Sequence, residues 1–174
     1  MLTLAVTYPK LNVWPAALLA LAVVVLASAA NAECKGQLIV AGKGIPLTNA
    51  YAYLTKGFFD ETKNDTVVLL TDAAVTDAVV HDHFALSRMA DEGKLHFVQA
   101  TVNPAGQVIN FSVGHNGFQF APGGGSTEHK FEPKARDAKN ISGTLLTAGP
   151  QKGPMGGPAY EYKAEFATAV QPKR

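Results

Sequence analysis

YEYKAEFATAV, residues 160–170, alternates two kinds of side chain with a period of two. One face is aromatic, aliphatic or small, and the other begins with three charged residues, Glu161, Lys163 and Glu165. A period of two places alternate side chains on opposite faces of a β-strand. One apolar and one charged face are typical of an antiparallel strand that borders the core. We therefore expect Tyr160 and Tyr162 in the core of a fold built mainly from antiparallel strands.

Similar segments recur upstream, separated by Gly, Pro and charged turns. Thr66–Thr71 is apolar on both faces and predicts a central, doubly buried strand. The turn at Pro104-Ala105-Gly106 predicts a hairpin between its two flanking segments. The full set of strands predicted before residue 160 covers residues 37–41, 49–55, 66–71, 95–103, 107–113, 127–132 and 141–147.

One helix is predicted around residues 78–92, which contain neither Gly nor Pro and precede Gly93. Leu86, Met89 and Ala90 lie three to four positions apart and form the face expected to pack on a sheet, with Val79 and His83 extending that stripe. The sequence as a whole therefore predicts a mainly β fold. We expect an antiparallel β-sandwich or a partly open barrel of about seven or eight strands with one α-helix.

Residues 1–32 have the features of a cleaved signal peptide. Lys10 is their only charge, an uncharged run follows from residue 13 to residue 30, and Ala30-Asn31-Ala32 matches a signal-peptidase site. An uncleaved membrane anchor is the alternative, although the run is short for a bilayer span. Glu33 in front of Cys34 argues against lipidation. We expect an exported protein, periplasmic or secreted, with one β-rich domain at residues 33–170 and a disordered tail at 171–174.

Charge and cysteine content narrow the possible partners. The chain has 15 basic and 14 acidic residues, without a basic run, which argues against binding to nucleic acid or to an anionic membrane. No membrane span is expected after signal cleavage. Cys34 is the single cysteine, so it forms no intramolecular disulfide. It is either an idle thiol near a loose chain end or a bridge between two molecules.

No motif for nucleophilic catalysis, phosphate binding or zinc hydrolysis is found, which favours a non-catalytic binding module. Two Gly-rich segments, Gly114–Ser126 and Gly149–Pro158, predict flexible surface loops, and binding residues concentrate on such loops. The expected ligand is a partner protein, a cell-envelope component or a small molecule, and no cofactor is expected. The candidate contact residues all lie in the first loop: His115, Asn116, Phe118 and Phe120.

The alternative function is a His-based metal-binding protein or metalloenzyme. His81 and His83 would point to the same side of an extended chain and could share one divalent metal ion. In a helix the two imidazoles would diverge by roughly 200°, which prevents joint ligation. His96, His115 and His129 are the other imidazoles available to such a site.

Overall fold

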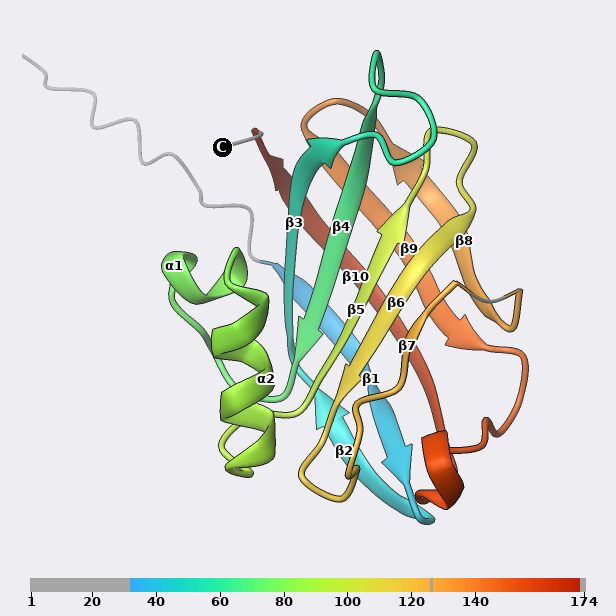
Figure 1. Cartoon of the computed structure of the whole chain (residues 1–174). Helices are drawn as coiled ribbons and strands as arrows, with labels where there is room; N and C mark the ends of the chain where they lie inside the picture. The colour runs from blue at the N-terminus through green and yellow to red at the C-terminus, as the bar shows by residue number, and fades with distance from the viewer. Residues whose placement is uncertain (1–31, 126, 173–174) are drawn as a thin grey trace, which may run out of the picture.

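The structure, a computed structural model, describes residues 32–125 and 127–172. Most of this part of the chain is strand, with two α-helices and one 3₁₀ turn between strands (Figure 1). The strands are β1 (Glu33–Val40), β2 (Lys43–Leu47), β3 (Asn49–Lys56), β4 (Asn64–Thr71), β5 (Phe97–Val102), β6 (Val108–Gly114), β7 (Gly123–Gly124), β8 (His129–Arg136), β9 (Asn140–Thr147) and β10 (Tyr160–Gln171). The helical elements are α1 (Asp77–Val80), α2 (His83–Asp91) and η1 (Pro154–Gly156).

The long strand β10 connects two antiparallel sheets. Along one edge it pairs with β9, which carries β8 on its far side. Along the other edge it pairs first with β1, which carries β2, and then for two residues with β3 in parallel. From β3 the second sheet continues through β4, β5 and β6 to β7. The sheet does not close, because no ladder joins β8 to β6 or β7, and β2 is a further edge strand.

The predicted fold class is confirmed: the protein is mainly β, antiparallel apart from the short β10–β3 contact, and carries one helix longer than two turns. The described residues form ten strands rather than seven or eight. The two additional strands, β2 and β7, contain Gly44, Pro46, Gly123 and Gly124, which are typical of turns. Their extended state depends on pairing with β1 and β6 rather than on propensity.

The main core lies between the two sheets. Tyr160 and Tyr162 of β10 are 4% and 2% exposed, which confirms that the alternation in residues 160–170 marks a half-buried strand. Strand β4 is buried along nearly its whole length, as its two apolar faces predict. Cys34 is also buried, because β1 pairs it with Phe166. The expectation that Cys34 lies near a loose chain end is therefore wrong.

The helices cover the outer face of β4 and β5 near one end. Leu86 and Ala90 of α2 are buried there in a second apolar cluster that includes Leu69 and Phe97. The single predicted helix is broken in two at His81-Asp82. Asp82 separates the two helices because it is the N-cap of α2, where its side chain accepts the Ala85 N–H at 3.0 Å. The first residue of α2, His83, is exposed rather than part of the buried stripe.

The ends of the chain bear on two further expectations. The predicted signal peptide lies outside the described residues, apart from Ala32. Strand β10 extends one residue beyond the predicted domain end, since Gln171 pairs with Tyr53. None of the helices within residues 32–125 and 127–172 has the length and apolar character needed to span a bilayer.

Candidate functional site

A groove of about 830 Å³ lies on the outer face of β3–β6, beyond the area that the helices cover. We call it the outer-face groove. Strand residues form its floor, Phe58 and Phe59 after β3 form one wall, and Ala121 with residues 123–125 around β7 form another. His83, at the first position of α2, lines the side nearest the helices. The groove thus combines segments from four regions of the sequence.

Uncharged polar side chains cover much of the floor. Alternation along β5 and β6 turns these residues away from the main core, whereas their neighbours Ala100 and Phe111 face into it. In the described part of the chain, none of the four polar floor side chains hydrogen-bonds to another described residue. Amides and hydroxyls with free hydrogen-bonding capacity can bind a polar ligand. The four residues are Gln99, Thr101, Asn110 and Ser112.

The β3–β4 loop forms a firm wall in spite of its exposure. Buried Asp65 accepts the backbone N–H of Phe58 at 2.8 Å, and this hydrogen bond ties the loop to the start of β4. Within the loop, Asp60 accepts bonds from the Thr62 N–H and hydroxyl at 3.0 and 2.6 Å. The hydrogen bonds from Thr62 and then from Lys63 lower the pKa of the Asp60 carboxyl to about 2. These polar contacts hold the aromatic pair Phe58-Phe59 at the rim.

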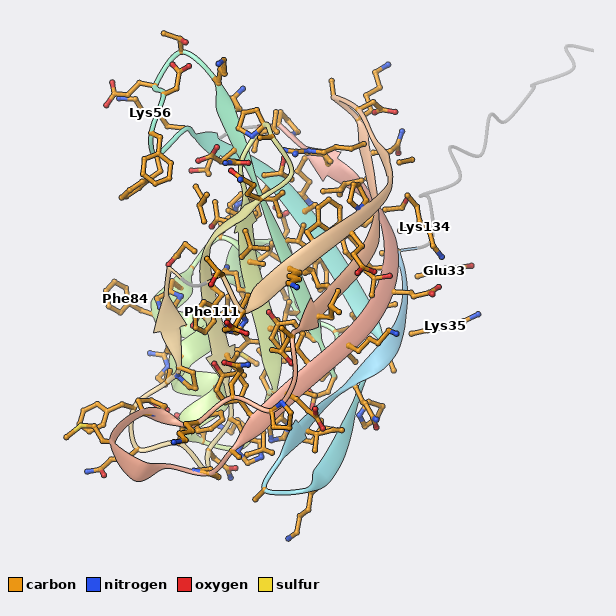
Figure 2. All side chains as sticks on the ribbon, turned by 90° about the vertical axis from the view of Figure 1, so that its right-hand side faces the viewer. Glu33, Lys35, Lys56, Phe84, Phe111 and Lys134 are labelled. Atoms are coloured by element: carbon orange, nitrogen blue, oxygen red, sulfur yellow. The ribbon has the colours of Figure 1, made fainter. Side chains whose placement is uncertain are left out.

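Large apolar side chains are exposed around the groove. Phe58 and Phe59 are 78% and 77% exposed, line the groove, and meet edge to face with ring centroids 5.0 Å apart. Phe84 follows the lining residue His83, and Phe120 precedes the lining residue Ala121. Figure 2 shows Phe84 projecting outward on the same side of the molecule as the loop beside Lys56. Exposed aromatic clusters of this kind mark interaction sites.

The opposite wall is the glycine segment, which is more ordered than a mobile loop. Gly123 and Gly124 pair with Ser112 and Phe111 of β6, and the Val113 N–H donates to the Pro122 carbonyl at 2.9 Å. A Cβ on Gly123 would lie 3.1 Å from the Phe111 carbonyl oxygen, so glycine permits this close approach. The prediction that all of residues 114–126 form a mobile surface loop is therefore wrong at residues 122–124, which are hydrogen-bonded to β6.

The predicted contact residues occupy different environments. Phe118 is 6% exposed and packs against Tyr160, so its ring belongs to the core and not to the surface. Phe120 is 51% exposed and precedes Ala121, which lines the groove. Asn116 is exposed and lies beside Gly93, at the end of the helical segment. His115 is half-buried against His96 and Phe118. None of the four lines the outer-face groove, and Phe120 comes nearest in sequence, next to the lining residue Ala121.

A carboxylate–imidazole pair lies at the end of β4. Asp72 accepts the His96 backbone N–H at 2.8 Å, and its other oxygen lies 2.6 Å from His96 Nδ1. Because a carboxylate oxygen only accepts, His96 Nδ1 donates in this contact, and in the neutral ring Nε2 is then an acceptor. Asp72 and His96 lie 24 residues apart in the sequence, and no motif connects them.

His115 completes a donor–acceptor pair with His96, whose ring centroid lies 4.8 Å away. His115 Nδ1 accepts the Gly117 N–H at 2.7 Å, so its proton is on Nε2 and that atom donates. Burial, and then the proximity of His96, lower the pKa of His115. Of the two rings, only His96 has a ring nitrogen with a free lone pair, because the lone pair of His115 Nδ1 is taken by the Gly117 N–H. The pair suits a bound water or hydroxyl better than joint chelation of a metal.

The predicted metal ligands His81 and His83 are in different surroundings. His81 Nε2 lies 3.0 Å from the Gln171 side-chain oxygen, and its ring packs on Tyr53. His83 is exposed beside Phe84. Because the helix is interrupted at Asp82, residues 81–83 form neither the extended segment that joint ligation needs nor part of a continuous helix. Residues 32–125 and 127–172 contain no group of three or more His, Cys, Asp or Glu side chains placed to hold a metal ion.

Comparison with known proteins gives no family model that matches the chain and no significant match among curated proteins or solved structures. The sequence contains partial signals for the groove. The alternation that turns Asn110 and Ser112 away from Phe111 can be read from β6 alone. Nothing in the sequence indicates that these residues share a hollow with Phe58 and Phe59, because they meet only through the order of strands in the sheet.

Proposed function

We propose that this protein is an exported, non-catalytic binding module whose ligand occupies the outer-face groove. The observation that carries the proposal is the combination of a neutral polar floor with a rim of exposed phenylalanine. Phe58 and Phe59 are more than three-quarters exposed, although solvent exposure of such rings is unfavourable. Covering them with a ligand removes that apolar surface from water.

The floor and rim favour a ligand with both apolar groups and uncharged hydrogen-bonding groups. Gln99 and Asn110 offer amide donors and acceptors, and Thr101 and Ser112 offer hydroxyls. Of the charged side chains at the groove, Lys56 pairs with Glu61, and Asp65 is occupied by the Phe58 N–H. A strongly charged ligand would therefore gain little there. A polypeptide segment of a partner or of a cell-envelope component fits this chemistry.

The scaffold is suited to binding because the groove is preformed. Its floor is a hydrogen-bonded sheet, and both walls are tied to that sheet by backbone contacts, through Asp65 on one side and β7 on the other. A preformed site loses little conformational entropy when its ligand binds. The binding energy then depends on a few rim aromatics, as at other protein interfaces.

Site-specific photo-crosslinking in the producing cell tests this function. A benzophenone side chain replaces Phe59 at the groove or, as the control, Met155, which is 81% exposed on η1 and does not line the groove. We expect a discrete crosslinked product from position 59 and none from position 155. The Asn110→Ala variant should reduce the product at position 59. Equal products from both positions, or none from position 59, would refute the proposal.

A further inference from the structure

The connection between β6 and β7 begins with a tight turn at residues 115–118 (Figure 1). The Phe118 N–H donates to the His115 carbonyl at 3.1 Å, and the Gly117 N–H donates to His115 Nδ1 at 2.7 Å. Asn, Asp and Ser are the usual residues at the first position of such a turn, because their side-chain oxygen accepts the N–H two residues further on. Here an imidazole nitrogen takes that role, so the acceptor that closes the turn can be protonated.

The surroundings of the His115 ring disfavour a positive charge on it. Burial lowers the pKa of His115 most, and the nearby His96 lowers it further, whereas the Asp72 carboxylate raises it by less. The Asp72 carboxylate is engaged with His96 Nδ1, so it offsets a charge on His96 first. On the side of β10, the apolar Phe118 ring contacts both His115 and Tyr160. The neutral form of His115 is therefore the one that fits this site.

Protonation of His115 removes the acceptor of the Gly117 N–H. It changes Nδ1 from an acceptor to a donor, so two N–H groups would point at each other across a 2.7 Å contact. Turning the ring over does not restore the hydrogen bond, because a carbon atom then replaces Nδ1. The turn would keep only the bond from the Phe118 N–H to the His115 carbonyl.

The turn anchors one end of the segment that forms a wall of the outer-face groove. Phe118 fixes this end to the core, because its ring is 6% exposed and packs on Tyr160. The other end is held on β6 by the bond from the Val113 N–H to the Pro122 carbonyl and by the two-residue ladder of β7. Opening the turn lengthens the unconstrained chain between these attachments. The entropy cost of keeping β7 paired then rises.

From this arrangement we infer that His115 is a pH switch for the outer-face groove. Its protonation breaks the Gly117 contact, loosens the wall formed by Ala121 and residues 123–125, and weakens ligand binding. The inference rests on the proposed function, because it adds regulation to the same groove. An exported protein is exposed to the pH of its surroundings, and histidine is the side chain that ordinarily changes its charge between pH 5 and 8.

NMR spectroscopy of the intact protein tests the switch without any substitution. At pH 7.5 the ring proton of His115 should be on Nε2. Between pH 7.5 and 5 the Gly117 amide should shift with the same midpoint as the His115 ring. The hydrogen-exchange protection of the Val113 and Phe118 amides should fall about tenfold, as expected for the loss of one hydrogen bond. A ring proton on Nδ1 at pH 7.5, or protection that is unchanged when the ring is protonated, would overturn the switch.

His115→Asn is the decisive variant, because the Asn side-chain oxygen accepts the N–H of Gly117 in an ordinary Asx turn and does not titrate. We expect it to keep the wild-type protection of Val113 and Phe118 at both pH values. All other titratable groups, including buried His129, are retained, so their response to acid is common to both proteins. His115→Ala lacks the acceptor and should show the acid level of protection already at pH 7.5. An equal loss of protection in wild type and His115→Asn on acidification would overturn the switch.

Crosslinking from position 59 tests the link between the turn and the groove. Producing cells are resuspended at pH 7.5 or 5 before irradiation. We expect about tenfold less product at pH 5 in the protein with His115 and equal products in His115→Asn. Equal products at both pH values with His115 present would overturn control of binding by the turn. Absence of a product at either pH would instead refute the groove as the binding site, and the NMR measurements identify this case because they need no ligand.

Discussion

The imidazole of His129 lies nearly parallel to the ring of Phe111, with centroids 3.5 Å apart and planes inclined by 16°. His129 begins β8 and Phe111 lies in β6, so the stack links two strands that no ladder joins. The Nδ1 atom of His129 lies 2.7 Å from the Tyr162 hydroxyl, and its Nε2 atom lies 3.4 Å from the Tyr160 hydroxyl. The buried imidazole is thus hydrogen-bonded as a neutral ring within the core.

Burial lowers the pKa of His129 to about 4, and this makes stability depend on pH. In the unfolded chain the group titrates near 6.5. Above pH 6.5 both states are neutral at this site, and its contribution to stability is fully present. As the pH falls from 6.5 to 4, the unfolded state gains a proton that the folded state does not, so the free energy of unfolding falls by about 3 kcal/mol.

Urea denaturation at a series of pH values measures this dependence. His129→Phe, which keeps an aromatic ring on Phe111, should flatten the profile between pH 4 and 6.5. His83→Gln, which removes an exposed imidazole instead of the buried one, is the matched control. A wild-type profile that is flat in this interval would contradict a neutral buried His129.

Arg136 makes a second link, between β8 and the end of β5. Replacement by Gln removes the donors to the Asn103 and Val102 carbonyls, and we expect a loss of about 1–3 kcal/mol in the free energy of unfolding. Faster amide hydrogen exchange at residues 103–107 should accompany it. Lys134→Gln is the control, because Lys134 pairs with Glu165 on the exposed face. Equal denaturation midpoints for both variants would show that the Arg136 bridge contributes nothing.

Gly36 lets β1 lie against β10. An added Cβ would be 2.3 Å from the Ala164 Cα and from the Lys163 carbonyl oxygen, both backbone atoms in the paired strand. Gly36→Ala should therefore cost about 3 kcal/mol or more and lower the soluble yield. Gly125→Ala serves as the comparison, since its Cβ meets the nearest atom at 3.4 Å. Circular dichroism melting of the two variants checks the difference.

Cys34 should be inert to thiol reagents in the folded protein. Burial between β10 and the core raises the pKa of its thiol to about 11 and blocks access. We expect negligible reaction with a disulfide-exchange chromophore at pH 8 and one equivalent of reaction in guanidinium. Rapid modification without denaturant would show that the start of β1 opens readily.

Phe58 and Phe59 should matter for binding and not for folding. The double variant Phe58→Ser/Phe59→Ser removes two exposed rings, so the free energy of unfolding should change by less than about 0.5 kcal/mol. The product crosslinked by a benzophenone side chain at Thr101, on the groove floor, should fall at least tenfold. Met155→Ser, which removes another exposed apolar side chain, should affect neither quantity. A large loss of stability in the double variant would assign these rings a structural role.

Wherever one segment has a clear buried face, the sequence is sufficient. The alternation in β10, the fully apolar β4 and the Pro-Ala-Gly turn between β5 and β6 each predict the element that forms. Tyr160 and Tyr162 could be assigned to the core for the same reason. Burial acts on each residue separately, and its period of two is therefore visible in a single strand.

The site could not be derived in this way. Strand β7 is two glycines that extend only because β6 pairs with them, and Phe118 leaves its Gly-rich segment to pack on Tyr160. Asp72 and His96 meet only because β4 and β5 are neighbours. Such contacts join residues that no local pattern relates.

The amino-acid order alone determined that the protein is mainly β, where its strands alternate, and which tyrosines enter the core, because these properties depend on one segment and its contact with water. The tertiary structure alone decided that the sheet stays open between β6 and β8 and that Phe58-Phe59 face Asn110 and Ser112 across one groove. These features depend on which strands become neighbours. That choice is made by the packing of the whole chain.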